Sequence, residues 1–274
     1  ISGLKVTYGR VSRYGAIAYA SSLDTVGPMA KSSQDLAIIL EQIAGIDPYD
    51  ATSSPVEIPK YSKNLDIDFN KIKVGIPFEL NLQINDVIAK FKELGARIVD
   101  VTLPMLKQAV SVYYLLAPSE TSSNLGRYDG IRYGHGRQNF TQETMRRIMI
   151  GTYALSAGYY DAYYKKAQQA RTKIIEDYNK AFEKCDVIII PISPYIAPKF
   201  GELISDPVKN MLADLYTCTT NIAGIPSLAL PCGFEEGMPV GFQIQGPMFS
   251  VEMLLQAGYA YQQATTWHHE KPTL

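Results

Sequence analysis

The clearest hydrophobic pattern in the chain consists of two short apolar runs near its C-terminal end. They cover Ser227–Pro231 and Val240–Ile244, and the polar segment Gly233–Pro239 separates them. Leu, Ala, Val, Phe and Ile crowd both runs instead of alternating with polar residues, as in strands that are buried on both faces. The pattern predicts a β-hairpin in the middle of a sheet. The preceding residues, Asn221–Pro226, contain Gly and Pro, and we expect this fixed backbone to bring polar residues to one end of the sheet, where α/β proteins usually hold ligands.

A strand–helix–strand pattern lies in the first half of the chain. The spacing predicts a buried strand over Ile72–Pro77, an amphipathic helix over Ile84–Leu94 and a second strand over Arg97–Pro104, which the helix would make parallel to the first. The apolar run Cys185–Pro191 predicts a further buried strand. Helical spacing predicts helices over residues 32–45, 105–116, 141–184 with a break near Gly158, 206–215 and 251–263. Together these elements predict the α/β class, with one domain whose mixed sheet is covered by helices on both faces.

The composition is that of a globular protein with almost no net charge. Of the 274 residues, 46% are hydrophobic, and 26 basic residues oppose 27 acidic ones. Such a chain can bury a large core, but it lacks the basic excess with which proteins grip nucleic acid over a broad face. Its three cysteines form no CxxC pair, which argues against a metal site and a disulfide framework and favours a reducing cytoplasm. No apolar run reaches the roughly 18 residues of a membrane-spanning helix.

Four stretches of the sequence resemble a known family. They are Gly3–Gly15 (GLKVTYGRVSRYG), Ser21–Met29 (SSLDTVGPM), Ser156–Ile174 (SAGYYDAYYKKAQQARTKI) and Thr219–Gly246, which holds the predicted hairpin. The last stretch is similar to the C-terminal part of the amidase signature enzymes. The other three are similar, within that family, to the glutaminase subunits of tRNA-dependent amidotransferases. The resemblance covers almost the whole chain.

The resemblance implies an amidase signature fold and a specific activity. Enzymes of this kind hydrolyse glutamine, and the ammonia converts Glu-tRNA(Gln) to Gln-tRNA(Gln) on a partner subunit, with conversion of Asp-tRNA(Asn) to Asn-tRNA(Asn) as a second reaction open to them. The resemblance further implies a heterotrimer with subunits B and C, in which the partner holds ATP, Mg²⁺ and most of the tRNA. We therefore expect no cofactor on this chain.

The resemblance also places the catalytic residues outside this chain. In the family, a Lys, a cis-peptide Ser and a nucleophilic Ser carry out acyl transfer, and their signature would lie upstream of Gly3. The first residue is Ile and lies inside a motif, so we expect residues 1–274 to be a single amidase domain that lacks its N-terminal part. Two connections, near Asn81 and between Gly136 and Arg137, are shorter than those of family members, which leaves either trimmed loops or omitted residues.

Glutamine recognition requires two charged side chains, and Arg147 is the candidate for the first. The α-carboxylate of glutamine suits the fork of an Arg, and its α-ammonium suits a buried Asp or Glu. Gly151, Ala154 and Gly158 follow Arg147 at helical spacing and would let a ligand or another backbone approach closely. The other face of this helix carries the apolar side chains expected to be buried: Met145, Ile148, Met149 and Thr152. That arrangement leaves open the alternative that Arg147 is an ordinary surface residue.

Asp214 is the candidate for the α-ammonium. It lies among apolar neighbours shortly before the predicted hairpin, although an acid on a helix surface would show the same pattern. In the family that the chain resembles, the corresponding Arg and Asp hold the carboxylate and ammonium of glutamine, and the Tyr that corresponds to Tyr113 lines the same pocket. The resemblance thus implies a glutamine site of Tyr113, Arg147 and Asp214. We assign no metal-binding or catalytic role to the three histidines.

Two other functions fit parts of the pattern. An amidase signature hydrolase of small or aryl amides would share the fold, but it would lack the glutamine-specific Arg and Asp and the sequence of Ser156–Ile174. A non-catalytic scaffold subunit would keep the fold without needing the upstream catalytic residues. The sequence upstream of Ile1 distinguishes such a scaffold from an enzyme.

Overall fold

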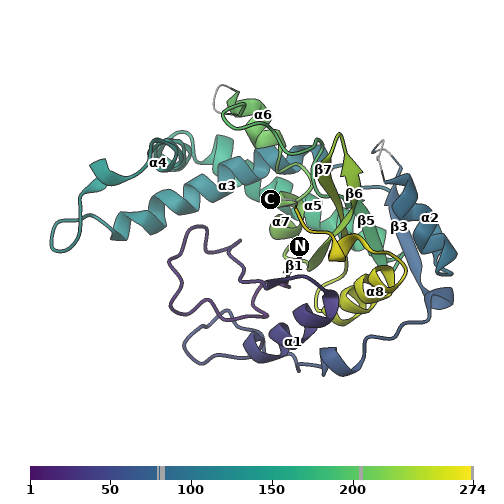
Figure 1. Cartoon of the computed structure of the whole chain (residues 1–274). Coiled ribbons are helices and arrows are strands. Elements are labelled where there is room, and N and C mark those ends of the chain that lie inside the picture. The colour runs from purple at the N-terminus through teal and green to yellow at the C-terminus, as the bar shows by residue number, and fades with distance from the viewer. Residues whose placement is uncertain (79, 81–83, 204–205, 273–274) are drawn as a thin grey trace.

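Seven strands form one mixed sheet in the part of the chain that the computed structural model describes, residues 1–78, 80, 84–203 and 206–272 (Figure 1). They are β1 Ser2–Lys5, β2 Met29–Ala30, β3 Lys73–Pro77, β4 Arg97–Val101, β5 Val187–Pro191, β6 Ser227–Glu235 and β7 Met238–Gln245. Their order across the sheet is β2-β1-β6-β7-β5-β3-β4. β3 is parallel to β4 and β5, and the other neighbouring pairs are antiparallel. The predicted mixed sheet and its parallel pair are confirmed.

The predicted hairpin is confirmed, and it occupies the centre of the sheet as β6 and β7. Its strands are longer than the apolar runs suggest, because Phe234 pairs with Pro239 and Glu235 pairs with Met238 across the polar segment. The turn is thereby reduced to Glu236 and Gly237, with φ of 50° and 77°. Two residues with positive φ match the right-handed twist of the flanking strands, which favours such a tight turn. Polarity alone therefore overestimated the length of the loop.

The helices cover the two faces of the sheet separately. They are α1 Ser33–Ile43, α2 Asn85–Glu93, α3 Ala109–Asn124, α4 Gln142–Leu155, α5 Lys166–Phe182, α6 Pro207–Leu212, α7 Cys218–Ala223 and α8 Val251–Gln263. α1, α2 and α8 share a core with Ile189 of β5, whereas α3, α5 and α7 share a second core with Ile188 and Ile190 of the same strand. Because successive side chains of a strand point to opposite faces, one apolar run serves both cores. The predicted helical cover on both faces is confirmed.

Two helical segments differ from the sequence prediction. α3 continues to Asn124 instead of ending at Leu116, because Ser119 Oγ and Thr121 Oγ1 donate to the carbonyls one turn back and so satisfy their own polarity inside the helix. The segment before the hairpin was expected to have a fixed backbone, and no helix was predicted in it. It instead contains α7, which ends at Gly224 with φ 74°, and the left-handed conformation of that glycine closes the helix.

The long helical segment predicted over residues 141–184 is interrupted where expected. α4 ends at Leu155, Gly158 takes φ 86°, and a π-helical turn over Asp161–Lys165 leads into α5. The short connection between Gly136 and Arg137 lies at the start of a 3-10 turn, Arg137–Asn139, in the projecting segment between α3 and α4 (Figure 1). The other short connection, near Asn81, lies outside the described residues.

α4 packs closely on α3 because a glycine lies at the contact. A Cβ on Gly151 would lie 1.9 Å from the carbonyl oxygen of Pro118, and Ala154 on the same face is 1% exposed. Only a residue without a side chain permits this approach of the two backbones. The contact sets the position of α4 relative to α3, and both helices carry candidate site residues.

Replacing Gly151 with alanine is expected to destabilise the protein by about 2 to 3 kcal/mol, because α4 must move away from α3. The intrinsic helix propensity of Ala favours the substitution by roughly 1 kcal/mol, so any net loss reports the contact. Urea unfolding measures the difference. Gly126→Ala is the matched control, since a Cβ there meets nothing within 4 Å. Equal stability of the two variants would contradict the close packing of α3 and α4.

Candidate functional site

The guanidinium of Arg147 is held from several sides on α4. Its Nε donates to Glu143 Oε1 at 2.7 Å, and its Nη1 donates to the Tyr19 hydroxyl at 2.6 Å. Its Cζ lies 5.4 Å from the ring centroid of Tyr114 and 5.9 Å from that of Tyr19, within cation–π range. Burial lowers the pKa of Arg147, but the hydrogen bonds to Glu143 and Tyr19 outweigh it and raise the pKa above its ordinary value. The side chain is 21% exposed, so a ligand can still reach this fixed cation.

The prediction that the apolar face of α4 is buried is wrong. Met149 is 67% exposed and Thr152 is exposed, whereas the fully buried positions of α4 are Gly151 and Ala154. Small residues are buried here because they let the helix approach α3 closely. Arg147 shares this side of the helix and contacts Tyr114 of α3, so it is not the ordinary surface residue of the alternative interpretation. Gly158 lies beyond the end of α4 and does not belong to the stripe.

Asp214 lies between α6 and α7 and is hydrogen-bonded to α3. The hydroxyl of Tyr114 donates to Asp214 Oδ2 at 3.0 Å. Burial and the charge of Asp214 raise the pKa of Tyr114, so this hydroxyl keeps its proton and can donate. Asp214 is half-buried, and no basic side chain in the described ranges forms an ion pair with it. Its carboxylate can therefore accept a cationic group.

Tyr113 completes the group of residues that the sequence singled out. Its ring meets the ring of Tyr114 edge-on, with centroids 5.0 Å apart. Burial raises the pKa of Tyr113, and its hydroxyl interacts with both Arg147 and the charge of Asp214. The fold thus brings Tyr113, Arg147 and Asp214 together from α3, α4 and the segment before α7. Their role in binding glutamine remains a prediction.

Two members of this site were missed by the sequence analysis, Tyr114 and Tyr19. Tyr114 contacts both charged candidates, because its ring lies under Arg147 and its hydroxyl bonds Asp214. Tyr19 lies in a loop that Asp24 and Asn124 fix, through hydrogen bonds to its backbone N–H and carbonyl respectively. The only available signal for Tyr114 was its place beside Tyr113. Nothing in the periodicity pairs Tyr19 with a helix 128 residues away.

The segment that carries Asp214 is anchored to the sheet by buried polar side chains. Gln243 of β7 donates from Nε2 to the carbonyls of Tyr216 and Pro191, each at 3.1 Å. Lys5 of β1 donates to the carbonyl of Thr220 at 2.9 Å and to that of Ile225 at 2.7 Å. Burial, together with the charge of Arg171, lowers the pKa of Lys5 to about 7. These bonds fix both ends of α7. A cavity of about 340 Å³ lies beside them, and its polar lining includes Lys5, Thr217, Thr220, Asn221, Ser227 and Gln243.

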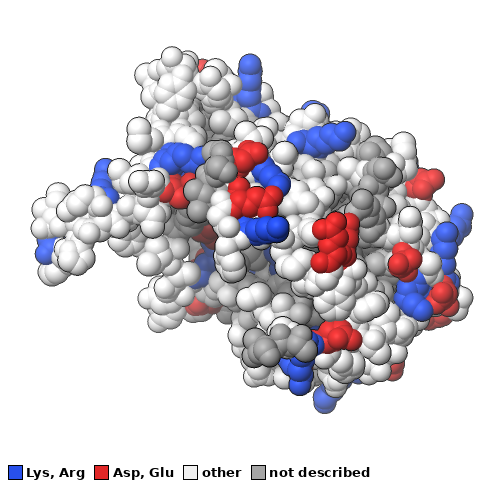
Figure 2. Space-filling model, turned by 45° about the horizontal axis from the view of Figure 1, so that its top comes forward, with Lys and Arg blue, Asp and Glu red and all other residues white. Residues whose placement is uncertain are grey.

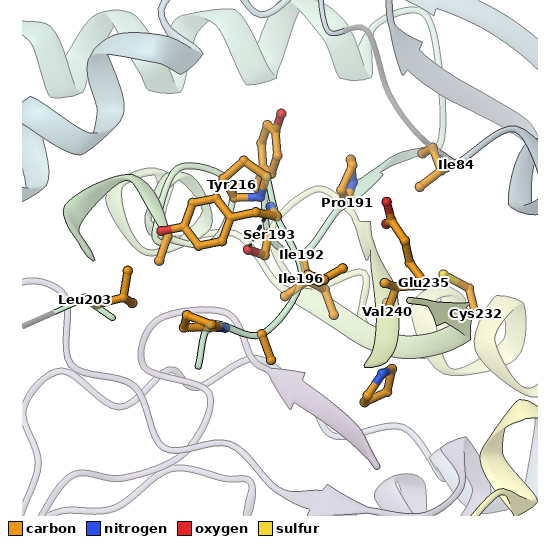
Figure 3. Close-up of a pocket in the computed structure, with 17 residues that line it drawn as sticks. Ile84, Pro191, Ile192, Ser193, Ile196, Leu203, Tyr216, Cys232, Glu235 and Val240 are labelled. Atoms are coloured by element: carbon orange, nitrogen blue, oxygen red, sulfur yellow. Dashed lines mark hydrogen bonds between the residues drawn. The ribbon is translucent and has the colours of Figure 1, made fainter. Parts of the chain in front are cut away.

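A second cavity, of about 450 Å³, opens between the connection after β5 and the β6–β7 hairpin. Figure 3 shows that its walls are mainly apolar, with Ile84, Ile192, Ile196, Leu203 and Val240 around it. Among the residues that the structure describes, Glu235 is the only charged one that lines it, and none of the three candidate residues does so. Tyr216 borders this cavity and lies two residues from Asp214. The described part of this wall thus offers one carboxylate and no cation, whereas the Arg147–Asp214 group contains one charge of each sign.

Metal ligation and membrane insertion find no support in the described ranges. No three His, Cys, Asp or Glu side chains there stand close enough together to hold a metal ion. None of the helices in those ranges is both long and apolar enough to span a membrane. His268 and His269 stack on one another in the C-terminal segment, with ring centroids 3.8 Å apart.

Comparison with known proteins identifies relatives over the whole chain. The amidase family model matches residues 1–255. The chain is 47% identical to the A-type subunit of glutamyl-tRNA(Gln) amidotransferase from Desulfatibacillum aliphaticivorans and to the same subunit from Acaryochloris marina, in both cases over 100% of this chain. It spans 62% of the length of each of these relatives.

Solved structures with similar backbones share this fold. The crystal structure of the A-type subunit of glutamyl-tRNA(Gln) amidotransferase from Thermotoga maritima matches with a TM-score of 0.80 at 35% identity, over 97% of this chain and 58% of that one. A 6-aminohexanoate cyclic dimer hydrolase matches with a TM-score of 0.82 at 20% identity, over 99% of this chain and 62% of that one. At that identity the second match concerns the fold alone.

Proposed function

This chain belongs to the amidase family, and from that membership we propose that it forms the glutamine-binding part of the glutaminase subunit of a tRNA-dependent amidotransferase. In this proposal the protein hydrolyses glutamine, and the ammonia converts Glu-tRNA(Gln) to Gln-tRNA(Gln) on a partner subunit. Conversion of Asp-tRNA(Asn) to Asn-tRNA(Asn) is a second reaction open to such an enzyme. The relatives from the glutamyl-tRNA(Gln) amidotransferases support it, since they are 47% identical over the entire chain.

One observation carries the proposal: Tyr114 contacts both the Arg147 guanidinium, through its ring, and the Asp214 carboxylate, through its hydroxyl. Arg147 offers its guanidinium to the α-carboxylate of glutamine, and the second oxygen of Asp214 accepts the α-ammonium. Tyr113 bounds the space between them. Because both charged ends are held in this way, the side-chain amide is left as the free end that points toward the reacting group.

The chemistry itself belongs to residues that we place upstream of Gly3. There a serine attacks the carbonyl carbon of the side-chain amide, and a second serine and a lysine move the protons. The C–N bond breaks, ammonia leaves with a proton, and water then releases glutamate from the acyl-enzyme. Residues 1–274 are then a single amidase domain without its N-terminal part. ATP and Mg²⁺ bind to the partner, the complex contains subunits B and C, and it works in the cytoplasm.

The assay that tests the proposal uses the protein with subunits B and C, ATP, Mg²⁺ and Glu-tRNA(Gln). Glutamine labelled with ¹⁵N in its side-chain amide should yield Gln-tRNA(Gln) that carries the label. Free ammonia should replace glutamine at high concentration, since only the partner then has chemistry to perform. Failure of the label to appear in the product although free ammonia still supports its formation, or hydrolysis of simple amides in preference to glutamine, would count against the proposal.

Contact with tRNA is assigned mainly to the partner. On the face shown in Figure 2, Lys and Arg are interspersed with Asp and Glu, in keeping with the formal net charge of −1. With so little net charge, the chain alone should bind tRNA no better than non-specifically, with a Kd of about 1 to 100 μM at physiological salt. Filter binding of Glu-tRNA(Gln) at two salt concentrations measures this. Nanomolar, salt-sensitive binding by the chain alone would overturn the assignment.

A further inference from the structure

Glu143 is a carboxylate held between two arginines of its own helix. Its Oε1 accepts from Arg147 Nε at 2.7 Å, and its Oε2 accepts from Arg146 Nη2 at 2.6 Å. Partial burial raises the pKa of Glu143, but the hydrogen bonds and charges of the two arginines lower it overall. The carboxylate is therefore ionised and fixed on both oxygens. It lies one turn before Arg147 on α4, so it moves together with that residue.

Glu143 restricts how Arg147 can meet a ligand. An Arg side chain can bind a carboxylate through Nε and Nη2 or through Nη1 and Nη2. Glu143 occupies Nε, and Tyr19 accepts from Nη1. The first of the two binding edges is thereby closed to a ligand, and the rotation of the guanidinium is restrained on both sides. What remains is the end of the guanidinium where the two Nη atoms meet, because Nη1 carries two N–H groups and the Tyr19 hydroxyl accepts from only one of them.

We propose that Glu143 is the positioning residue of the carboxylate subsite: it fixes Arg147 so that only the Nη1–Nη2 end presents itself to the α-carboxylate of glutamine. The identity of the ligand in this inference rests on the proposed function. The orientation of Arg147 does not, because it is a property of the protein without a ligand.

Two effects of Glu143 on a carboxylate ligand oppose each other, and two variants separate them. The orientation of Arg147 favours binding, whereas the negative charge of Glu143 repels the ligand. Glu143→Gln keeps an oxygen that accepts from Nε and removes the charge. Glu143→Ala removes both. Because each variant loses the same charge, the difference between them reports the positioning alone.

The first measurement is calorimetric titration of the chain and its variants with L-glutamine and with glutaramate, which has the carboxylate but no ammonium. Glu143→Gln should bind both at least as tightly as the original chain. Glu143→Ala should bind both about tenfold more weakly than Glu143→Gln, because the Arg147 guanidinium loses the hydrogen bond that holds its orientation. Arg146→Ala leaves the Glu143–Arg147 contact in place and should bind normally. Equal affinity of the Ala and Gln variants overturns the proposal.

The second measurement needs no ligand. In ¹H–¹⁵N spectra the Nε–H signal of Arg147, assigned from its loss in Arg147→Lys, should exchange slowly with water in the original chain and in Glu143→Gln. It should exchange at least severalfold faster in Glu143→Ala. Thermal unfolding should change little, because Glu143 is 46% exposed and an ion pair with such a carboxylate contributes little to stability. Equal exchange in the original chain and the Ala variant overturns the proposal. If the exchange differs as expected but no form of the chain binds glutamine, the positioning by Glu143 stands and the proposed function fails.

Discussion

Replacing Arg147 with alanine is expected to weaken the binding of glutamine to the chain by about 30- to 700-fold. The charge-assisted, bidentate contact with the α-carboxylate is worth roughly 2 to 4 kcal/mol, and each 1.4 kcal/mol corresponds to a factor of ten. The fold should survive, since the close contact of α4 with α3 is made by Gly151 and Ala154. Titration calorimetry gives the affinity, and circular dichroism at increasing temperature gives the stability.

Arg146→Ala provides the matched control for this variant. Arg146 precedes Arg147 on α4 and also pairs with Glu143, but neither Tyr114 nor Tyr19 forms a cation–π contact with it in the described part of the chain. Loss of Arg146 therefore removes one positive charge without removing the proposed ligand contact. If both variants weaken glutamine binding equally, the effect is one of general charge. An unchanged affinity of Arg147→Ala would remove Arg147 from the site.

Replacing Asp214 with asparagine is expected to change selectivity more than overall affinity for carboxylates. A site that contained only Arg147 would accept any carboxylate-bearing amide, whereas an acid that faces the ammonium disfavours ligands that leave it buried and unpaired, by several kcal/mol. The original chain should thus prefer glutamine to glutaramate. In Asp214→Asn the affinity for glutamine should fall by about 100-fold, while that for glutaramate should hold or rise.

The asparagine variant should preserve the local structure, because its side-chain oxygen can still accept from the Tyr114 hydroxyl as Asp214 Oδ2 does. Tyr114→Phe is the complementary control, since it removes this hydrogen bond and keeps the charge of Asp214. It should weaken both ligands by a similar, smaller factor. If Asp214→Asn weakens glutamine and glutaramate equally, Asp214 supports the structure and does not recognise the ammonium.

The helices and strands that could be predicted are those whose pattern of apolar and polar residues lies within the element itself. The continuous apolar runs of β5, β6 and β7 indicate buried strands without reference to any other part of the chain, so the sheet and its central hairpin could be predicted. α7 could not, because its sequence CTTNIA contains β-branched and polar residues that form helices poorly. Contacts from far along the chain support it, since Lys5 donates to the carbonyl of Thr220 and Arg171 donates to that of Ile222. Cations at the C-terminal end of a helix stabilise its exposed carbonyls.

The candidate site shows a similar division between local and distant signals. The helical spacing correctly placed Arg147 on the face of α4 that carries small residues. It wrongly predicted that the opposite face is the buried one, because the prediction followed the apolar character of the side chains and not their size. The pairing of Arg147 with Asp214 came from the family resemblance and not from spacing. Tyr19 could not have been found, because its contact with Arg147 depends on a loop that Asp24 and Asn124 fix from different parts of the chain.

The central claim, that Arg147 and Asp214 together recognise the two charged ends of free glutamine, is tested most directly by titrating the chain with three ligands. These are L-glutamine, glutaramate, which lacks the ammonium, and 4-aminobutanamide, which lacks the carboxylate. The account predicts saturable one-to-one binding of glutamine, with each analogue weaker by at least about tenfold because it lacks one of the two charged contacts with the site. Equal affinities for the three ligands, or no saturable binding of glutamine, would contradict it.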